Sequence, residues 1–462
     1  CPCFLFSSLS RTLMFFSYLY LPASLPMATN IPVTTEKLYQ LIRKFPVVTT
    51  DSRKIPARSM FFALKGENFD GNRFAGQALE QGAAIAIVDD PAVVKDHRYM
   101  VVDDVLRSLQ QLARFHRNRM NIPVIGITGS NGKTTTKELI HAVLSRKYQT
   151  LATHGNLNNH IGVPLTLLSI TTNTQIAVVE MGANHVGEIA FLCELARPTH
   201  GLITNIGRAH LEGFGGFDGV ILAKTELYSY FRRHGGEVFL NLGDPLLTEH
   251  ARKLNLYTYG LIPSASVSGT PEPGSDRVAV KINFPNGRSQ LIRSSLFGSY
   301  NNLNMVAAAC VGSSFGISIA SITRAIESYT PDNNRSQLFQ TARNLLVLDA
   351  YNANPSSMTI ALKDFDQAFP ENKIVILGDM LELGSETEQD HRQILKLLES
   401  LDLKRVFLVG PVFSQLNTRK RWRTFATSDM AMEWFNSHPV KKANILLKGS
   451  RGIQLEKIVE YL

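Results

Sequence analysis

The chain alternates short apolar runs with longer segments in which apolar residues recur every three or four positions. Residues 124–127 form an apolar run of strand type, which stops at Thr128 and is followed by a glycine-containing turn. The next apolar residues share one face of a helix: Leu139, Ile140, Val143 and Leu144. Further strand-type runs cover residues 176–180 and 202–206, and a helical pattern covers residues 221–228. Strands that alternate with helices predict a parallel sheet.

The same alternation starts again at about residue 331. Four strand-type runs occupy residues 345–349, 374–377, 406–409 and 445–447. Helical patterns lie between or after them, at residues 357–368, 391–401, 429–436 and 454–461. This order predicts a second, Rossmann-like parallel sheet. None of its strands is followed by a Gly-x-Gly-x-x-Gly turn, so the pattern does not indicate a dinucleotide.

A smaller α/β domain is expected before these two sheets. It is predicted to contain a short helix around Leu38, strands at residues 60–64 and 83–88, and a helix at residues 74–81. Residues 262–295, with their Gly and Pro clusters, predict a β-rich decoration of the central part. The predicted fold class is therefore α/β with three domains, at residues 27–107, 108–330 and 331–462.

Composition agrees with a globular protein of several domains. The 462 residues are 44% apolar and 19% charged, and a chain of this length is too long for one core. The net charge is +9, but Lys and Arg are scattered, which favours a polyanionic small substrate over nucleic acid. The four cysteines have neither metal nor disulfide spacing, which is consistent with a reducing compartment: Cys1, Cys3, Cys193 and Cys310.

Residues 1–26 are apolar and aromatic and begin with Cys1 rather than Met. One interpretation is an upstream flank of the true start, Met27; the other is a signal peptide or membrane anchor. The longest apolar run, residues 13–21, is too short to span a bilayer and contains Ser17. We therefore favour the first interpretation, leave the segment out of the fold prediction and expect no membrane association.

The turn after the first central strand has the composition of a phosphate-binding loop. Such a turn directs backbone N–H groups at an anion, and the N-terminus of the following helix adds partial positive charge. Lys133 would pair with the terminal phosphates, and the Thr134 hydroxyl would bind Mg²⁺. An ordinary glycine-rich turn is the alternative, but Gly-Lys-Thr between strand and helix favours a P-loop ATPase-type domain. The residues assigned to the nucleotide are Gly129, Ser130, Asn131, Gly132, Lys133, Thr134 and Thr135.

Two further polar residues follow neighbouring predicted strands. Glu180 ends one strand, and His210 lies in the loop after the next. In open α/β sheets ligands bind beyond the carboxyl ends of the strands, so these residues and Thr134 predict a Mg²⁺ site. Taken singly, Glu180 could cap a helix and His210 could be an ordinary loop histidine.

Polar segments elsewhere are candidate substrate contacts. Residues Asp51, Ser52 and Arg53 could bind a diphosphate, or could form an Asx turn beside a solvated Arg. Residues 154–160 are a loop rich in amides that includes Asn159.

The C-terminal domain supplies its own candidates after its first strand. Asp349 could bond a ribose hydroxyl, and Tyr351 and Asn352 follow it in the same loop. Arg335, just past the domain boundary, could reach a transferred phosphate or could be a solvated linker residue.

These motifs together resemble the muramyl ligase family, a group of ATP-dependent amide ligases related to folylpolyglutamate synthases. Six segments carry the resemblance, in the family's order: residues 128–135, 223–226, 296–309, 349–355, 377–384 and 448–451. It covers the chain after Met27. Tyr300 departs from the pattern, because His is commoner there. The last three segments are most similar to those of family members that add D-alanyl-D-alanine.

The resemblance implies an ATP-dependent ligase of peptidoglycan precursor synthesis that forms an amide through an acyl phosphate. Its substrates would be UDP-N-acetylmuramoyl-tripeptide, with the UDP held by the N-terminal domain, and D-alanyl-D-alanine. It implies ATP and two Mg²⁺ ions, one held by Thr134 and Glu180. His210 and a carboxylated Lys224 would help to hold the other, although a helical lysine is usually a surface residue. A cytoplasmic enzyme is expected, and a monomer.

The resemblance also implies roles for individual residues. Lys133, Lys224, His210 and Arg335 would be catalytic, and Asn301 would contact the base, although it could equally cap a helix. A related ligase with another amine acceptor, including one of the folylpolyglutamate type, is an alternative. A nucleotide-binding scaffold without turnover is another, but the intact motif residues argue against it.

Overall fold

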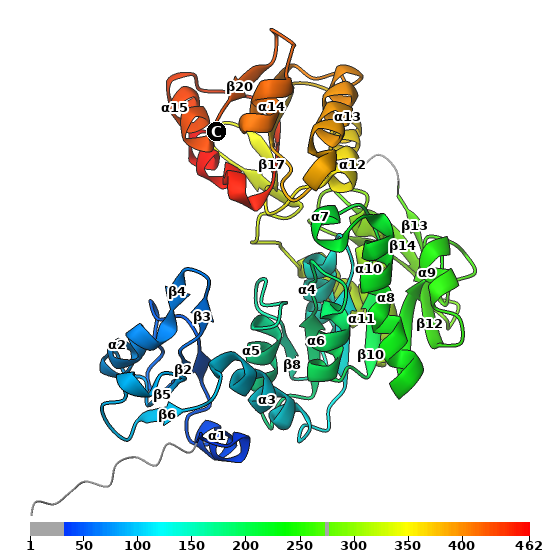
Figure 1. Ribbon diagram of the computed structural model, residues 1–462. Helices are drawn as coiled ribbons and strands as arrows, with labels where there is room; N and C mark the ends of the chain where they lie inside the picture. Colours follow the sequence, from blue (N-terminus) through cyan, green and yellow to red (C-terminus); the bar gives the residue numbers. More distant parts are fainter. Residues whose placement is uncertain (1–31, 273–276) are drawn as a thin grey trace, which may run out of the picture.

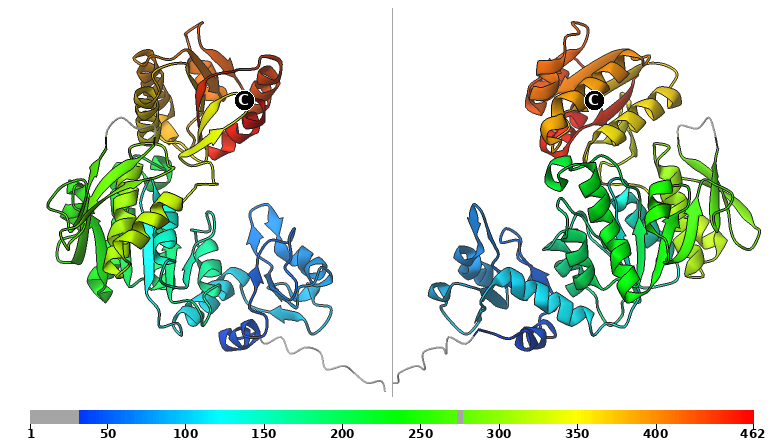
Figure 2. Two further views of the ribbon diagram at one scale, coloured as in Figure 1. Left: turned by 180° about the vertical axis from the view of Figure 1, so that it is seen from behind. Right: turned by 45° about the vertical axis from the view of Figure 1, so that its right-hand side comes forward.

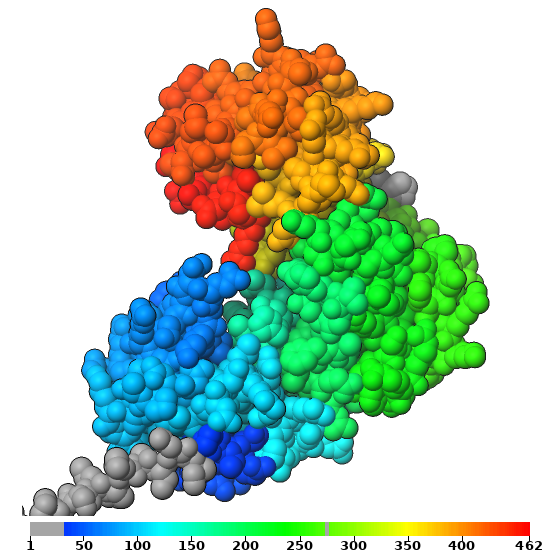
Figure 3. All heavy atoms as spheres, viewed as in Figure 1, coloured from blue at the N-terminus to red at the C-terminus, as the bar shows by residue number. Residues whose placement is uncertain are grey.

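A computed structural model describes residues 32–272 and 277–462. The interpretation of residues 1–26 lies outside this range. Figure 1 shows three α/β domains that follow one another along the chain, the first in blue, the central one in cyan to green and the last in yellow to red. This arrangement confirms the predicted fold class. In Figure 3 the surface is hollowed between the first and the last domain.

The N-terminal domain has a four-stranded parallel sheet in the order β1-β2-β5-β6. Its strands are β1 (Val48–Thr49), β2 (Met60–Phe62), β5 (Ile85–Val88) and β6 (Tyr99–Val101). The helices are α1 (Thr35–Ile42), α2 (Ala75–Glu80), η1 (Gly71–Phe74) and η2 (Pro91–Val93), and β3 (Lys65–Gly66) pairs with β4 (Phe69–Asp70). The sheet is buried on both faces, because α2 covers one face and α1 packs against the other.

Helix α3 (Val105–Arg117) joins the first two domains. Its buried Leu109 and Leu112 belong to a hydrophobic cluster that contains Phe62 of the N-terminal sheet and Leu167 and Leu192 of central helices. The two domains therefore share one continuous core. The expected boundary between residues 107 and 108 falls inside α3.

The central domain is built on a nine-stranded sheet in the order β15-β14-β13-β12-β11-β10-β7-β9-β8. Its strands are β7 (Val124–Thr128), β8 (Thr150–Ala152), β9 (Ile176–Glu180), β10 (His200–Ile203), β11 (Glu237–Asn241), β12 (Asn255–Gly260), β13 (Val267–Pro271), β14 (Ala279–Asn283) and β15 (Ser289–Arg293). Pairing is parallel from β8 to β13 and antiparallel from β13 to β15. The segment predicted as a β-rich decoration thus extends the main sheet.

Helices cover both faces of this sheet (Figures 1 and 2). One face carries α3, α5 (Gly162–Leu168), α6 (Glu188–Ala196) and α8 (Phe217–His234), and the other carries α4 (Lys133–Leu144), α10 (Asn301–Ser314) and α11 (Ile319–Ser328). The shorter α7 (Leu211–Phe214) and α9 (Pro245–His250) complete the domain. Helix α10 packs closely on α4 because its contact face is small: a Cβ on Gly312 would lie 2.5 Å from Val143. This packing fixes α4, which begins at the predicted phosphate loop.

The C-terminal domain has a six-stranded sheet in the order β16-β17-β21-β18-β19-β20, parallel except for β16. Its strands are β16 (Gln337–Gln340), β17 (Leu345–Asp349), β18 (Lys373–Gly378), β19 (Arg405–Val409), β20 (Arg423–Phe425) and β21 (Asn444–Lys448). Helices α12 (Pro355–Ala368), α13 (Thr387–Glu399) and α14 (Pro411–Leu416) cover one face, and α15 (Ser428–Ser437) and η5 (Leu455–Tyr461) cover the other. The short η3 (Gly384–Glu386) and η4 (Arg451–Ile453) are 3-10 turns. The four predicted strands are confirmed, but the last helical pattern forms the 3-10 helix η5 rather than an α-helix.

No helix within residues 32–272 and 277–462 is both long and apolar enough to cross a membrane.

Candidate functional site

A cavity of about 870 Å³ lies where the central and C-terminal domains meet. Its walls come from the loops that follow β7, β9 and β10, from the start of α10, and from the loops that follow β17 and β18. The carboxyl ends of two parallel sheets therefore face one space. This is the place where open α/β sheets bind ligands.

The loop after β7 is shaped by two glycines with positive φ, Gly129 at 140° and Gly132 at 79°. A Cβ on Gly129 would lie 2.0 Å from the Thr204 hydroxyl, and one on Gly132 would lie 2.9 Å from Asn304 Oδ1. Thr204 also donates a hydrogen bond of 2.6 Å to the Asn131 carbonyl. Glycine is thus required at both positions, by conformation and by space. The loop has the strand–turn–helix setting that phosphate binding needs.

Lys133, the first residue of α4, folds back over this loop. Its Nζ donates to the carbonyls of Gly129 at 2.6 Å and Ser130 at 3.1 Å. Burial, opposed by the charge of Glu180 and aided by that of Arg335, lowers the pKa of Lys133 to about 8. Carbonyl oxygens do not neutralise an ammonium group. Within the described part of the chain Lys133 forms no ion pair, so its ammonium group is available to a phosphate group that enters the cavity.

Glu180, at the end of β9, is 1% exposed. Its Oε1 accepts hydrogen bonds from Thr134 Oγ1 at 3.3 Å and from Asn158 Nδ2 at 2.8 Å. Its Oε2 has no hydrogen-bond partner, and Lys137 Nζ lies 3.8 Å away. The structure thus brings together Thr134 and Glu180, as the sequence predicts. A buried carboxylate oxygen with no hydrogen bond beside a threonine hydroxyl fits the oxygen ligands that Mg²⁺ prefers.

Lys224 is a buried residue of α8, not a solvated surface lysine. Its Nζ donates to the Ala183 carbonyl at 3.3 Å and lies 5.0 Å from the centroid of the Phe214 ring. Burial, aided by the charge of Lys133, lowers the pKa of Lys224 to about 7. Ala183 lines the cavity, so the lysine lies just behind the cavity wall.

His210, the N-cap of α7, has a positive φ of 54° and lines the cavity. Its Nδ1 lies 2.5 Å from Glu382 Oε2, on the loop after β18, so the ring pairs with a carboxylate of the other domain. This pairing lowers the pKa of Glu382. Among the described residues, no three His, Cys, Asp or Glu side chains gather as a metal site. In this arrangement His210 and Lys224 border the same region without converging.

Arg335 lines the cavity from the linker between the domains. Its guanidinium lies 3.7 Å from the centroid of the Tyr351 ring, and its buried Nε has no hydrogen-bond partner. Arg335 is thus partly buried and packs against an aromatic ring. Asn352 also lines the cavity, and its side chain accepts a hydrogen bond from the Ala353 backbone.

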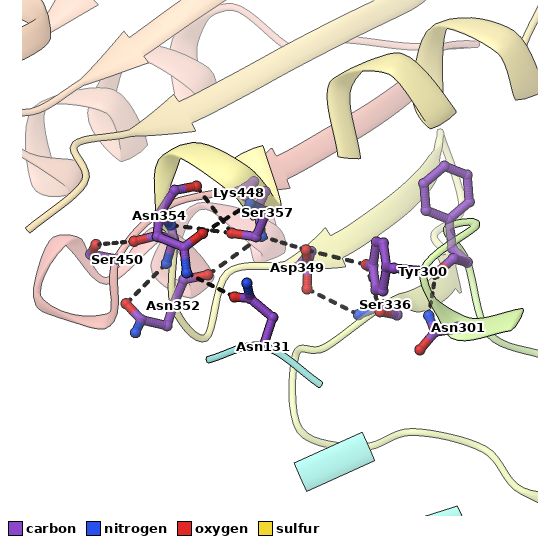
Figure 4. Close-up of polar contacts among 12 residues, drawn as sticks. Asn131, Tyr300, Asn301, Ser336, Asp349, Asn352, Asn354, Ser357, Lys448 and Ser450 are labelled. Carbon is purple, nitrogen blue, oxygen red and sulfur yellow. Dashed lines mark hydrogen bonds and ion pairs between the residues drawn. The ribbon is translucent and has the colours of Figure 1, made fainter. Parts of the chain in front are cut away.

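Asp349 is held by its neighbours at the end of β17 (Figure 4). It accepts hydrogen bonds from Lys448 Nζ at 2.5 Å, from Ser336 N at 3.2 Å and from the Tyr300 hydroxyl at 3.4 Å. Tyr300 thus links the start of α10 to this carboxylate. Burial raises the pKa of Tyr300.

Asn301 does not line the cavity. Its side chain is fully buried, donates to the Phe297 carbonyl at 2.7 Å and accepts from Asn304 Nδ2 at 2.8 Å. The amide is thus already bonded to Phe297 and Asn304, and the expected contact of Asn301 with a base stays a prediction. Asn304, one turn later, is the asparagine of this motif that lines the cavity.

The remaining predicted substrate residues lie in two places. Asn159 lines the cavity, and its side chain accepts backbone hydrogen bonds from Ile161 and Gly162. Asp51 and Arg53 form an exposed ion pair at 2.9 Å, away from the cavity-lining residues, and Ser52 lies between them. Arg53 also donates its backbone N–H to Asp51, as in an Asx turn, and this pairing lowers the pKa of Asp51 to about 2.

Sequence reasoning assigned no role to Asn158 or Asn354, two of the cavity residues that hold other site residues in place. Asn158 fixes Glu180, although only its neighbour Asn159 was chosen from the amide-rich loop. Asn354 donates a hydrogen bond of 2.7 Å to the Asn131 side chain, from the other domain. A sequence signal existed for each: Asn158 is one of three Asn in one loop, and Asn354 precedes Pro355 as an N-cap does.

Three family models match the chain. The Mur ligase family, catalytic domain, matches residues 44–126; the Mur ligase middle domain matches residues 127–312; the Mur ligase, glutamate ligase domain, matches residues 334–451. Together these models span all three domains.

Individual proteins are similar over nearly their full length. UDP-N-acetylmuramoyl-tripeptide–D-alanyl-D-alanine ligase of Bacillus subtilis is 35% identical, over 90% of this chain and 92% of that relative. A crystal structure of MurF from Acinetobacter baumannii has a TM-score of 0.81 and 32% identity, and covers 93% of this chain and 98% of that one. A structure of MurF ligase from Thermotoga maritima in complex with ADP has a TM-score of 0.79 and 26% identity. The match covers 90% of this chain and 96% of that one.

Proposed function

Because this chain belongs to the Mur ligase family, we propose that it joins D-alanyl-D-alanine to UDP-N-acetylmuramoyl-tripeptide with ATP, in the synthesis of peptidoglycan precursors. One observation carries the proposal. Lys133, Glu180 and Arg335, from the phosphate loop, a strand end and the interdomain linker, line one cavity between the central and C-terminal domains. Relatives named for this reaction match over nearly the whole chain.

The reaction requires an activated acid, because a carboxylate is a poor electrophile. An oxygen of the tripeptide's terminal carboxylate attacks the γ-phosphorus of ATP, the bond to ADP breaks, and an acyl phosphate forms. The amine of D-alanyl-D-alanine then attacks the acyl carbon, a proton leaves the nitrogen, and phosphate departs. Lys133 and Arg335 would bind the oxygens on which negative charge collects.

The residues present fit a bound Mg²⁺ ion. Thr134 and Glu180 would hold it, because the Glu180 Oε2 atom has no hydrogen-bond partner and lies beside the phosphate loop. Bound there, the ion would neutralise phosphate charge. His210 and a carboxylated Lys224 would help to hold a second ion. Burial of Lys224 supports the carbamate, because CO₂ reacts with a neutral amine.

The other parts of the chain have complementary roles in the proposal. The N-terminal domain would hold the UDP group, with Asp51, Ser52 and Arg53 among its contacts, and the C-terminal domain would bring the dipeptide. Closure of the two outer domains would keep water from the acyl phosphate. We further propose that the enzyme works as a monomer in the cytoplasm, where ATP is available.

Phosphate release by the protein from Met27 onward tests the proposal. The assay contains ATP, Mg²⁺, UDP-N-acetylmuramoyl-tripeptide and D-alanyl-D-alanine, and each component is omitted in turn. We expect phosphate release that requires both the tripeptide and the dipeptide, and that is lost in the Lys133→Ala variant. Phosphate release that requires neither the tripeptide nor the dipeptide would reject the proposed function. A panel of single amino acids and other dipeptides then distinguishes a related ligase with another acceptor.

A further inference from the structure

The linker that carries Arg335 is bonded to the central domain just before this residue. Glu138, on α4, accepts hydrogen bonds from Asn333 Nδ2 at 3.1 and 3.0 Å and from the Tyr329 hydroxyl. Tyr329 ends α11, and Asn333 lies two residues before Arg335. Both oxygens of one carboxylate thus bind the linker.

The same linker is bonded to the C-terminal domain just after Arg335. Ser336 donates its backbone N–H to Asp349 at 3.2 Å and shares a hydrogen bond of 2.7 Å with the Tyr300 hydroxyl. Figure 4 shows Ser336, Asp349 and Tyr300 together at this point. Arg335 therefore lies between two tethers. Glu138 of the central domain holds the linker before it, and Asp349 of the C-terminal domain together with Tyr300 of the central domain holds Ser336 after it.

The backbone between the tethers is strained. Asn334 and Ser336, on either side of Arg335, both have positive φ, at 56° and 52°. Asn adopts this left-handed conformation fairly readily, whereas Ser rarely does, so the surroundings impose it at Ser336. With the backbone in this conformation on both sides, the Arg335 side chain points into the cavity and packs against Tyr351.

We propose that Glu138 is a positioning residue for Arg335. It lies on α4 one turn after Thr134, so a rigid helix connects the phosphate loop with the linker. The proposal rests on the proposed function, because it gives Arg335 a transferred phosphate to bind. A carboxylate suits the position, since it accepts all three hydrogen bonds and offers the donors of Tyr329 and Asn333 no competing N–H.

A double-mutant cycle tests whether Glu138 acts through Arg335. In Glu138→Ala we expect kcat for phosphate release to fall about tenfold to a hundredfold, because the guanidinium is displaced, while KM for ATP stays within about threefold. In the Arg335→Ala background, Glu138→Ala should cause no further fall in kcat. Losses that multiply in the double variant would overturn the proposal. Asn333→Ala replaces Glu138→Ala in the same cycle if that variant does not fold.

Two controls separate this role from a general loss of structure. Glu327→Gln alters a carboxylate on the neighbouring α11 that accepts from Arg293 N, and it should leave kcat unchanged. The rate of trypsin cleavage after Arg335 measures how firmly the linker is held, and this measurement does not require enzyme activity. We expect faster cleavage in Glu138→Ala than in the wild type or Glu327→Gln, and an unchanged rate would contradict the tether. Absence of turnover in the wild type would instead reject the proposed function.

Discussion

Asn354 of the C-terminal domain donates a 2.7 Å hydrogen bond to the side chain of Asn131, in the phosphate loop of the central domain. The same Asn354 caps α12: its side chain accepts from Ser357 N at 2.9 Å, and its backbone N–H donates to the Ser357 hydroxyl. One amide therefore joins a helix N-terminus to the loop proposed to bind ATP (Figure 4).

Replacing Asn354 separates these two functions. Asn354→Ser keeps an oxygen that can cap the helix but removes the N–H donor, so stability should be nearly unchanged. We expect kcat/KM for ATP to fall about twofold to tenfold, the worth of one such hydrogen bond. Asn354→Ala should in addition lose about 1 kcal/mol of folding free energy through the missing cap. If Asn354→Ser has wild-type kinetics, the asparagine serves α12 alone.

The phosphate loop should not tolerate a side chain at Gly129. Gly129→Ala would place a Cβ 2.0 Å from the Thr204 hydroxyl at a φ of 140°. We expect the loop to shift and the Kd for ADP, measured by calorimetry, to rise at least about tenfold, because each misaligned N–H is lost to the phosphates. Gly155→Ala is the matched control, since its φ is also positive but no atom lies within 4 Å. It should cost about 1–2 kcal/mol of stability and leave ADP binding intact.

Lys224→Ala tests the proposed carbamate. Removal of the amine should reduce kcat for phosphate release at least about a hundredfold, as loss of a charge-stabilising group does. Acetate or formate in the assay should restore part of the activity, because a small carboxylate fits the space of the lost one. The same salts should not stimulate the wild type. A Lys224→Ala variant with undiminished kcat would rule the carbamate out.

Asp390 of α13 should make the fold less stable at neutral pH. It is 2% exposed and its Oδ2 has no hydrogen-bond partner, and burial raises the pKa of Asp390 although Arg208 and His391 oppose the shift. A carboxyl whose folded pKa is raised favours folding below its unfolded pKa and loses that contribution as pH rises through the folded value. Asp390→Asn should therefore stabilise the protein by about 1 kcal/mol at pH 7.5.

The pH profile of that variant is the sharper measurement. The difference in Tm between Asp390→Asn and the wild type should shrink as the pH falls from 7.5 towards 4.5, because the wild-type carboxyl then takes up its proton. Asp402→Asn alters an exposed carboxylate nearby in the sequence and should show no such trend. An unchanged difference at all pH values would mean that ionisation of Asp390 is not the cause.

Local sequence predicted those features that depend on local chemistry. Strand β17 was placed to the residue, because Leu345 to Leu348 form an apolar run that ends in Asp349. The strand–loop–helix unit around Gly129 and Lys133 was found for the same reason: its glycines and its Lys-Thr pair are adjacent in the chain. The Thr134–Glu180 contact followed from the rule that loops after parallel strands share one edge of the sheet.

Contacts between segments that lie far apart in the chain could not be predicted from the sequence. The Asn131–Asn354 bond joins residues 223 positions apart, and the partner of His210 lies in the other domain. Strands β13 to β15 extend the main sheet because β13 pairs with β12, which no local pattern encodes. Burial of Lys224 depends on how α8 lies against α6 and α7. The bond between the Asn301 and Asn304 side chains was likewise not predicted, because it depends on the geometry of α10.

The continuous core through α3 determines how the protein should unfold on heating. Side chains of the N-terminal sheet and of the central helices belong to one cluster, so loss of packing in one of these domains should also destabilise the other. Apart from Phe297, the clusters of the C-terminal domain contain only residues of that domain. Calorimetry should accordingly resolve two cooperative melting units, one of about three hundred residues and one smaller, in a protein whose chain folds into three domains.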